Sequence, residues 1–100
     1  MQKLVIALIF ASNCAHADVV ATAANNVGGT IALTDVTCGS ERGFHAYTTS
    51  PTAPTQFGCW WSDDLMVHIL WNSVEPRAYP LGSFSVDREK VQRMKKRNTY

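Results

Sequence analysis

The sequence predicts a mainly β protein: a small antiparallel meander of four to five strands with one disulfide and a short C-terminal helix. Three observations support this prediction. Short runs rich in β-branched and aromatic residues recur at regular spacing, polar turns separate them, and a helical pattern occurs only near the C-terminal end. One hundred residues allow at most one domain.

Residues 1–17 have the features of a secretory signal peptide. Lys3 supplies the positive charge, residues 4–11 are apolar but too few to span a bilayer, and the segment ends in A-H-A. We therefore expect cleavage before Asp18 and a periplasmic or secreted location. Lipidation of Cys14 is the alternative, although the residue immediately before it fits a lipoprotein site poorly.

Residues 18–84 make up the expected β-meander domain. Residues 18–26 are small and weakly apolar, so we expect a poorly packed lead-in or a short edge strand. The expected strands are residues 30–34, 44–49, 56–61, 65–72 and 77–81. The last of these belongs at an edge of the sheet, because Pro80 lacks the amide that a ladder requires.

Residues 85–100 are expected to form a basic helix or tail. Ser85 is the expected N-cap, and the acidic side chains precede the basic ones, which complements the helix dipole. The end of the chain, from Val86 onward, is basic, whereas the body from Asp18 to Ser85 is acidic. Four basic residues are candidates for contact with a polyanion or an anionic membrane: Arg93, Lys95, Lys96 and Arg97. The alternative is a solvated helix end that aids solubility or docks on the acidic body.

Removal of the signal peptide leaves two cysteines, Cys38 and Cys59, which form a candidate disulfide in an exported protein. Closing a loop of about twenty residues restricts the unfolded chain by roughly 3 kcal/mol. A free thiol nucleophile or a pair of metal ligands is less favoured, because the chain has no C-x-x-C motif.

The segment FGCWWSDDLMVHILW, residues 57–71, predicts a β-hairpin. A three-residue loop at residues 62–64 would place Trp61 opposite Leu65. The core face would then carry Phe57, Cys59, Trp61, Leu65, Val67, Ile69 and Trp71. The opposite face would carry Trp60, Met66 and His68, which we regard as a candidate binding surface. Burial of this face under the N-terminal segment or the C-terminal helix is the alternative.

Catalytic chemistry has little support in the sequence. Asp63 and Asp64 fall in the expected turn, where adjacent carboxylates seldom converge on one substrate and lack the further oxygen ligands of a calcium site. His45 and His68 would need further ligands to hold zinc. The chain has neither a G-x-S-x-G motif nor a phosphate-binding loop. We therefore predict no enzyme activity, no catalytic residue, no metal and no cofactor.

Six short motifs occur in the chain in a fixed order: I-A-L-T (31–34), Cys38, G-F-H-A-Y (43–47), G-C-W (58–60), V-H-I-L-W (67–71) and Y-P-L-G-S-F (79–84). In this pattern the chain resembles a group of small exported proteins of unknown function from proteobacteria and their tailed phages. The resemblance implies a signal peptide, a single disulfide and a β-meander, and it supplies no activity.

These observations favour a non-enzymatic, exported binding module that recognises a protein or an envelope polymer through the face of Trp60. If the gene is carried by a phage, the protein would be an envelope factor, which acts on the host envelope. We expect no nucleic-acid partner, because an exported protein rarely meets one. The alternative is a membrane-surface protein that acts through its basic C-terminal helix.

Overall fold

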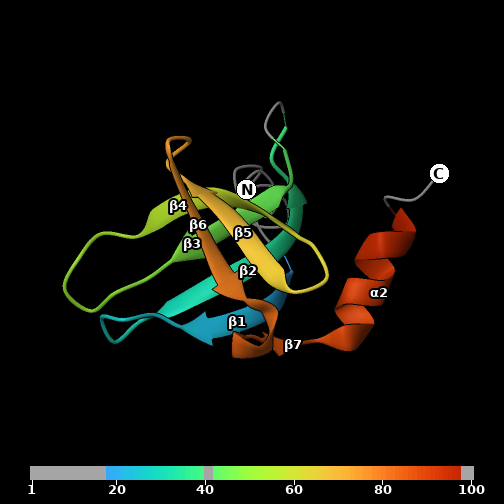
Figure 1. Cartoon of the computed structure of the whole chain (residues 1–100), viewed down its shortest axis with the longest axis horizontal. Helices are drawn as coiled ribbons and strands as arrows, with labels where there is room; N and C mark the ends of the chain where they lie inside the picture. Colours follow the sequence, from blue (N-terminus) through green and yellow to red (C-terminus); the bar gives the residue numbers. More distant parts are fainter. Residues whose placement is uncertain (1–17, 40–41, 98–100) are drawn as a thin grey trace, which may run out of the picture.

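The computed structural model in Figure 1 describes residues 18–39 and 42–97. The expected signal peptide and Cys14 lie outside the described residues. The described residues form a single antiparallel sheet of seven strands, in the order β6-β5-β4-β3-β2-β1-β7. The strands are β1 (Val19–Ala24), β2 (Thr30–Thr37), β3 (Phe44–Thr48), β4 (Gln56–Ser62), β5 (Met66–Trp71), β6 (Glu75–Pro80) and β7 (Ser85–Val86). The mainly β prediction is confirmed, but the sheet has more strands than the four to five expected.

The two additional strands lie next to one another at one end of the sheet. The weakly apolar β1 is a paired strand and not a loose lead-in, because Val20 and Ala21 are both buried in the core. An irregularity in the pairing between Val19 and Ala21 explains how two consecutive residues reach the same core. The two-residue β7 then covers part of the outer edge of β1.

The chain connection between β6 and β7 requires the sheet to curl. These strands lie at opposite ends of the sheet, and a flat sheet of this size would separate them by about 29 Å. The connection from Pro80 to Ser85 contains the short 3₁₀ helix η1 (Leu81–Ser83) and could span at most about 18 Å if fully extended. The sheet is therefore a curled half-barrel, and the connection that joins its two ends places Phe84 in the core.

The core fills the inner face of this half-barrel. It joins apolar side chains of six elements with Phe84: Val20, Ala21, Ile31, Leu33, Ala46, Trp60, Val67, Ile69, Trp71 and Met94. Inside the core, the Trp60 indole N–H donates a hydrogen bond to the Thr34 carbonyl at 2.9 Å, and the Trp71 indole N–H donates to the Tyr79 hydroxyl at 3.0 Å. Both indoles therefore bury their rings without leaving a donor unpaired.

The β4–β5 hairpin has a different register from the predicted one. Trp61 lies opposite His68, and not opposite Leu65, so the pairing is shifted by three residues. A shift by an odd number of residues moves the side chains of one strand to the opposite face of the sheet relative to those of its partner. The connection lies at residues 63–65 and not at 62–64: the Asp63 carboxylate accepts hydrogen bonds from the backbone N–H groups of Leu65 and Met66, and the Asp63 N–H donates to the Met66 carbonyl. The expected inner face of β5 is correct for Val67, Ile69 and Trp71 but wrong for Leu65, which lies in the turn and is 76% exposed. The expected inner face of β4 is wrong.

The C-terminal helix α2 (Arg88–Arg97) lies beside the β1 and β7 end of the sheet (Figure 1). Its N-cap is Asp87, whose carboxylate accepts a hydrogen bond from the Lys90 backbone N–H at 3.1 Å. The prediction of Ser85 as the cap is wrong, because Ser85 pairs with β1 as part of β7. Met94 is buried in the core, so the apolar side of α2 faces the sheet.

Candidate functional site

The outer face of the half-barrel carries a column of stacked side chains, which we call the outer column: Arg42, Trp61, His68 and Asp63. The Arg42 guanidinium lies 4.6 Å from the centre of the Trp61 ring. The His68 ring stacks on Trp61 with a centroid distance of 5.6 Å and an interplanar angle of 16°. The column thus presents a cation, two aromatic rings and a carboxylate on a face that the core does not use.

The turn between β4 and β5 holds the acidic end of this column. The Asp63 carboxylate lies 2.8 Å from His68 Nε2 and also accepts the two backbone hydrogen bonds that shape the turn. The hydrogen bond with His68, followed by those with the Leu65 and Met66 amides, lowers the pKa of Asp63 to about 2. Asp63 is therefore a carboxylate at all but the lowest pH values, and it orients the His68 ring.

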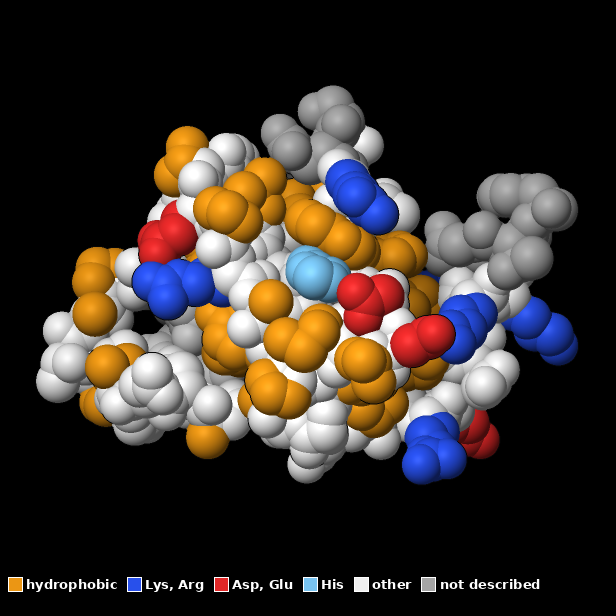
Figure 2. Space-filling model, viewed as in Figure 1, with side chains coloured by type: hydrophobic (Ala, Val, Ile, Leu, Met, Phe, Trp, Pro, Cys, Tyr) orange, Lys and Arg blue, Asp and Glu red, His pale blue; other side chains and the backbone are white. Residues whose placement is uncertain are grey.

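Apolar side chains surround the outer column. Met66 and Leu70 are half-buried on the same strand as His68, and Phe57 on β4 is 61% exposed. Phe57 packs loosely against Tyr47, with ring centroids 6.5 Å apart. Figure 2 shows hydrophobic side chains gathered around a histidine and acidic groups over β4, β5 and β6. This surface mixes apolar area with a few oriented polar groups, which is typical of a recognition surface.

The structure separates the three residues predicted to form a binding surface. Met66 and His68 lie on the outer face, but Trp60 is only 6% exposed and points into the core. The prediction that Trp60 shares an exposed face with them is therefore wrong, since the pairing of β4 is shifted. Trp61 and Arg42 take its place on the outer face. No pattern in the sequence links Arg42 to this surface, because it lies in the loop before β3.

The predicted disulfide between Cys38 and Cys59 is confirmed, with Cα atoms 6.1 Å apart. It joins the segment after β2 to β4 on the outer face, and not on the core face as predicted, because Cys59 and Trp60 point in opposite directions. His45 is exposed beside it, with Nδ1 3.7 Å from the Cys38 sulfur. The disulfide is compatible with an oxidising compartment.

The basic side chains of α2 differ in their surroundings. Arg97 donates a hydrogen bond to the Asp35 carboxylate at 2.8 Å, and this ion pair ties the last turn of α2 to β2. Arg93, Lys95 and Lys96 are exposed on the helix. Because Met94 packs into the core, α2 presents a charged side and not an apolar one to solvent.

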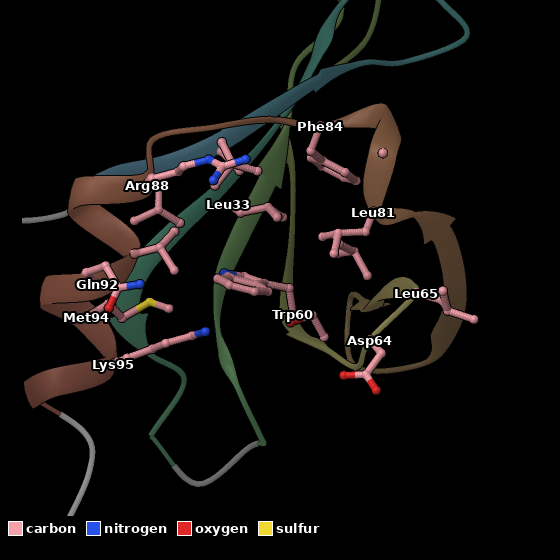
Figure 3. A pocket seen from close by; sticks show the side chains of 17 residues that line it. Leu33, Trp60, Asp64, Leu65, Leu81, Phe84, Arg88, Gln92, Met94 and Lys95 are labelled. Carbon is pink, nitrogen blue, oxygen red and sulfur yellow. The ribbon is translucent and has the colours of Figure 1, made fainter.

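A groove of about 740 Å³ separates α2 from the inner face of the sheet. Leu33, Trp60 and Phe84 lie at its floor, and Arg88, Gln92 and Lys95 line the wall formed by α2 (Figure 3). The opposite wall contains Leu81 and the β4–β5 turn, with Asp64 and Leu65. Neither the hydrophobic periodicity nor the cysteine spacing signals this groove, because it depends on where α2 packs.

Within residues 18–39 and 42–97, no group of three or more His, Cys, Asp or Glu side chains is placed to hold a metal ion. In the same part of the chain, none of the helical segments has the length and apolar character needed to cross a membrane. Comparisons with protein-family models, curated proteins and solved structures found no match to this chain.

Proposed function

We propose that this protein is a small, exported, non-enzymatic binding module that recognises a protein or an envelope polymer through its outer face. The observation that carries the proposal is the outer column, in which Arg42, Trp61 and His68 stack on one another in contact with solvent. Stacked aromatic and cationic side chains are frequent at the energetic centres of protein interfaces. The surrounding Met66 and Leu70 supply the apolar area that such a centre needs.

The disulfide and the features of residues 1–17 support export to the periplasm or the exterior. The resemblance to small exported proteins of proteobacteria and tailed phages supports a role at the bacterial envelope. A phage-borne copy would act there on the envelope of its host.

The outer column is tested by substitution of Trp61. The Trp61→Ala variant should lose most of its capture of a partner from a proteobacterial envelope extract, because truncating an aromatic hot spot costs about 2 kcal/mol or more. The matched control is Val27→Ala, which removes an apolar side chain that is 59% exposed on the β1–β2 turn. Thermal unfolding of both variants verifies that each is folded. Unchanged capture by a folded Trp61→Ala variant would refute the proposal.

A second candidate function is association with an anionic membrane surface through α2. It is favoured by the exposed Arg93, Lys95 and Lys96 on one ordered helix. Because the apolar side of α2 packs on the sheet, this association would be electrostatic and would weaken as salt rises. The test is co-sedimentation with vesicles rich in phosphatidylglycerol, where Arg93→Gln with Lys96→Gln should reduce binding. Equal binding to neutral vesicles would contradict it.

A further inference from the structure

The groove beside α2 has an apolar floor that the fold leaves open. Trp60, Phe84 and Met94 are each less than a tenth exposed, and they form its base together with Leu33 and Val67. The volume of about 740 Å³ lies within the range of small-molecule sites, which is roughly 300–1,000 Å³. The groove is therefore large enough for a ligand, and its floor consists of core side chains.

The apolar surface continues from the floor onto one rim of the groove. Leu81 is 37% exposed and lines the wall opposite α2, whereas Leu65, which is 76% exposed, lies at the end of this wall with its side chain directed away from α2 (Figure 3). These two leucines come from separate turns that meet here, since the Leu81 backbone N–H donates to the Leu65 carbonyl. An apolar ligand lying along the groove would cover the Leu81 side chain.

The charges on the two walls differ in sign. Arg88 and Lys95 line the wall formed by α2, and the Gln92 amide lies between them along the helix. The helix as a whole carries six basic residues and one acidic residue. Asp64 lies on the opposite wall. An anionic group is therefore favoured beside α2 and disfavoured at the β4–β5 turn, so a ligand with one charged end would be oriented.

We propose that this groove binds a single-chain anionic amphiphile, with its hydrocarbon chain over Trp60, Phe84 and Leu81 and its carboxylate beside Arg88 and Lys95. Charge complementarity with α2 identifies the head, and the apolar floor and rim identify the chain. A dispersed amphiphile can enter while α2 remains packed, whereas insertion into a bilayer would require Met94 to leave the core. The groove lies on the inner face, so this proposal is independent of recognition by the outer column.

The test is calorimetric titration of the exported, disulfide-bonded protein with dodecanoate below its micelle concentration. We expect one molecule to bind, and dodecanol, which has the same chain without charge, to bind at least about tenfold more weakly. The paired change Arg88→Gln and Lys95→Gln should weaken dodecanoate binding by about tenfold to thirtyfold. The matched control, Arg93→Gln with Lys96→Gln, removes the same charge from residues that do not line the groove. It should alter the affinity by less than about twofold.

The two adjacent tryptophans report where the ligand binds. Trp60 lines the groove and Trp61 lies on the outer face, so dodecanoate should shift the indole N–H resonance of Trp60 and leave that of Trp61 in place. The protein has three tryptophans, so Trp61→Phe and Trp71→Phe together identify the three indole resonances. The proposal is overturned by equal losses in the two double variants, by equal affinity for dodecanol or by a shift confined to Trp61. It also fails if the protein binds phosphatidylglycerol vesicles but not dodecanoate.

Discussion

Removal of the Cys38–Cys59 disulfide, by Cys38→Ala together with Cys59→Ala, should lower the free energy of unfolding by about 3 kcal/mol. The two cysteines are 21 residues apart, and closing a loop of this length removes about 11 cal/mol/K of entropy from the unfolded chain. The bridge lies on the outer face and Cys59 is only half-buried, so its removal leaves no void in the core. The loss should therefore come mainly from the unfolded state.

Urea unfolding followed by tryptophan fluorescence measures this effect. For a domain of this size the slope with urea is about 1 kcal/mol/M, so the midpoint should fall by about 3 M. Reduction of the wild-type protein should reproduce the fall, whereas the same reductant should leave the double alanine variant unchanged. A loss below about 1 kcal/mol would refute the loop-entropy reasoning, and a loss well above 5 kcal/mol would indicate that the bridge also supports the core.

Two further predictions concern individual positions. Gly43 has a φ of +92°, and an added Cβ would overlap the Trp60 carbonyl, so Gly43→Ala should cost more than about 2 kcal/mol in urea unfolding. Gly82→Ala, where an added Cβ meets no atom within 4 Å, should change stability by less than about 0.5 kcal/mol, and similar losses in both variants would contradict the argument. The pKa of Asp63 is lowered from 3.8 to about 2, chiefly by the hydrogen bond with His68, so its stabilising effect is complete above pH 3.8 and is lost as the pH falls through 2. The melting temperature of Asp63→Asn should therefore fall less than that of the wild type between pH 5 and pH 2. Parallel curves for the two proteins would show that this hydrogen bond does not stabilise the folded state.

The contrast between β4 and β5 shows how far the sequence alone can be interpreted. The alternation of Val67, Ile69 and Trp71 identifies the inner face of β5 correctly, because side chains on a strand point to opposite faces in turn. The same rule applied to β4 leaves two choices, since Trp60 and Trp61 are equally apolar. The position of the turn decides between them, and that position depends on which backbone groups Asp63 binds. The predicted outer surface was therefore correct for Met66 and His68 and wrong for Trp60.

The sequence by itself determined the strand-rich class, the cysteine pair, the edge position of the strand with Pro80 and the basic helix. Each of these follows from local chemistry: β-branched and aromatic residues favour strands, proline lacks an amide donor, and charge order matches the helix dipole. Only the tertiary structure decided that β1 and β7 join the sheet, that Trp61 and Arg42 stack on the outer face, and that α2 borders a groove. These features depend on the curl of the sheet and on pairing between residues distant in the chain, which no local pattern encodes.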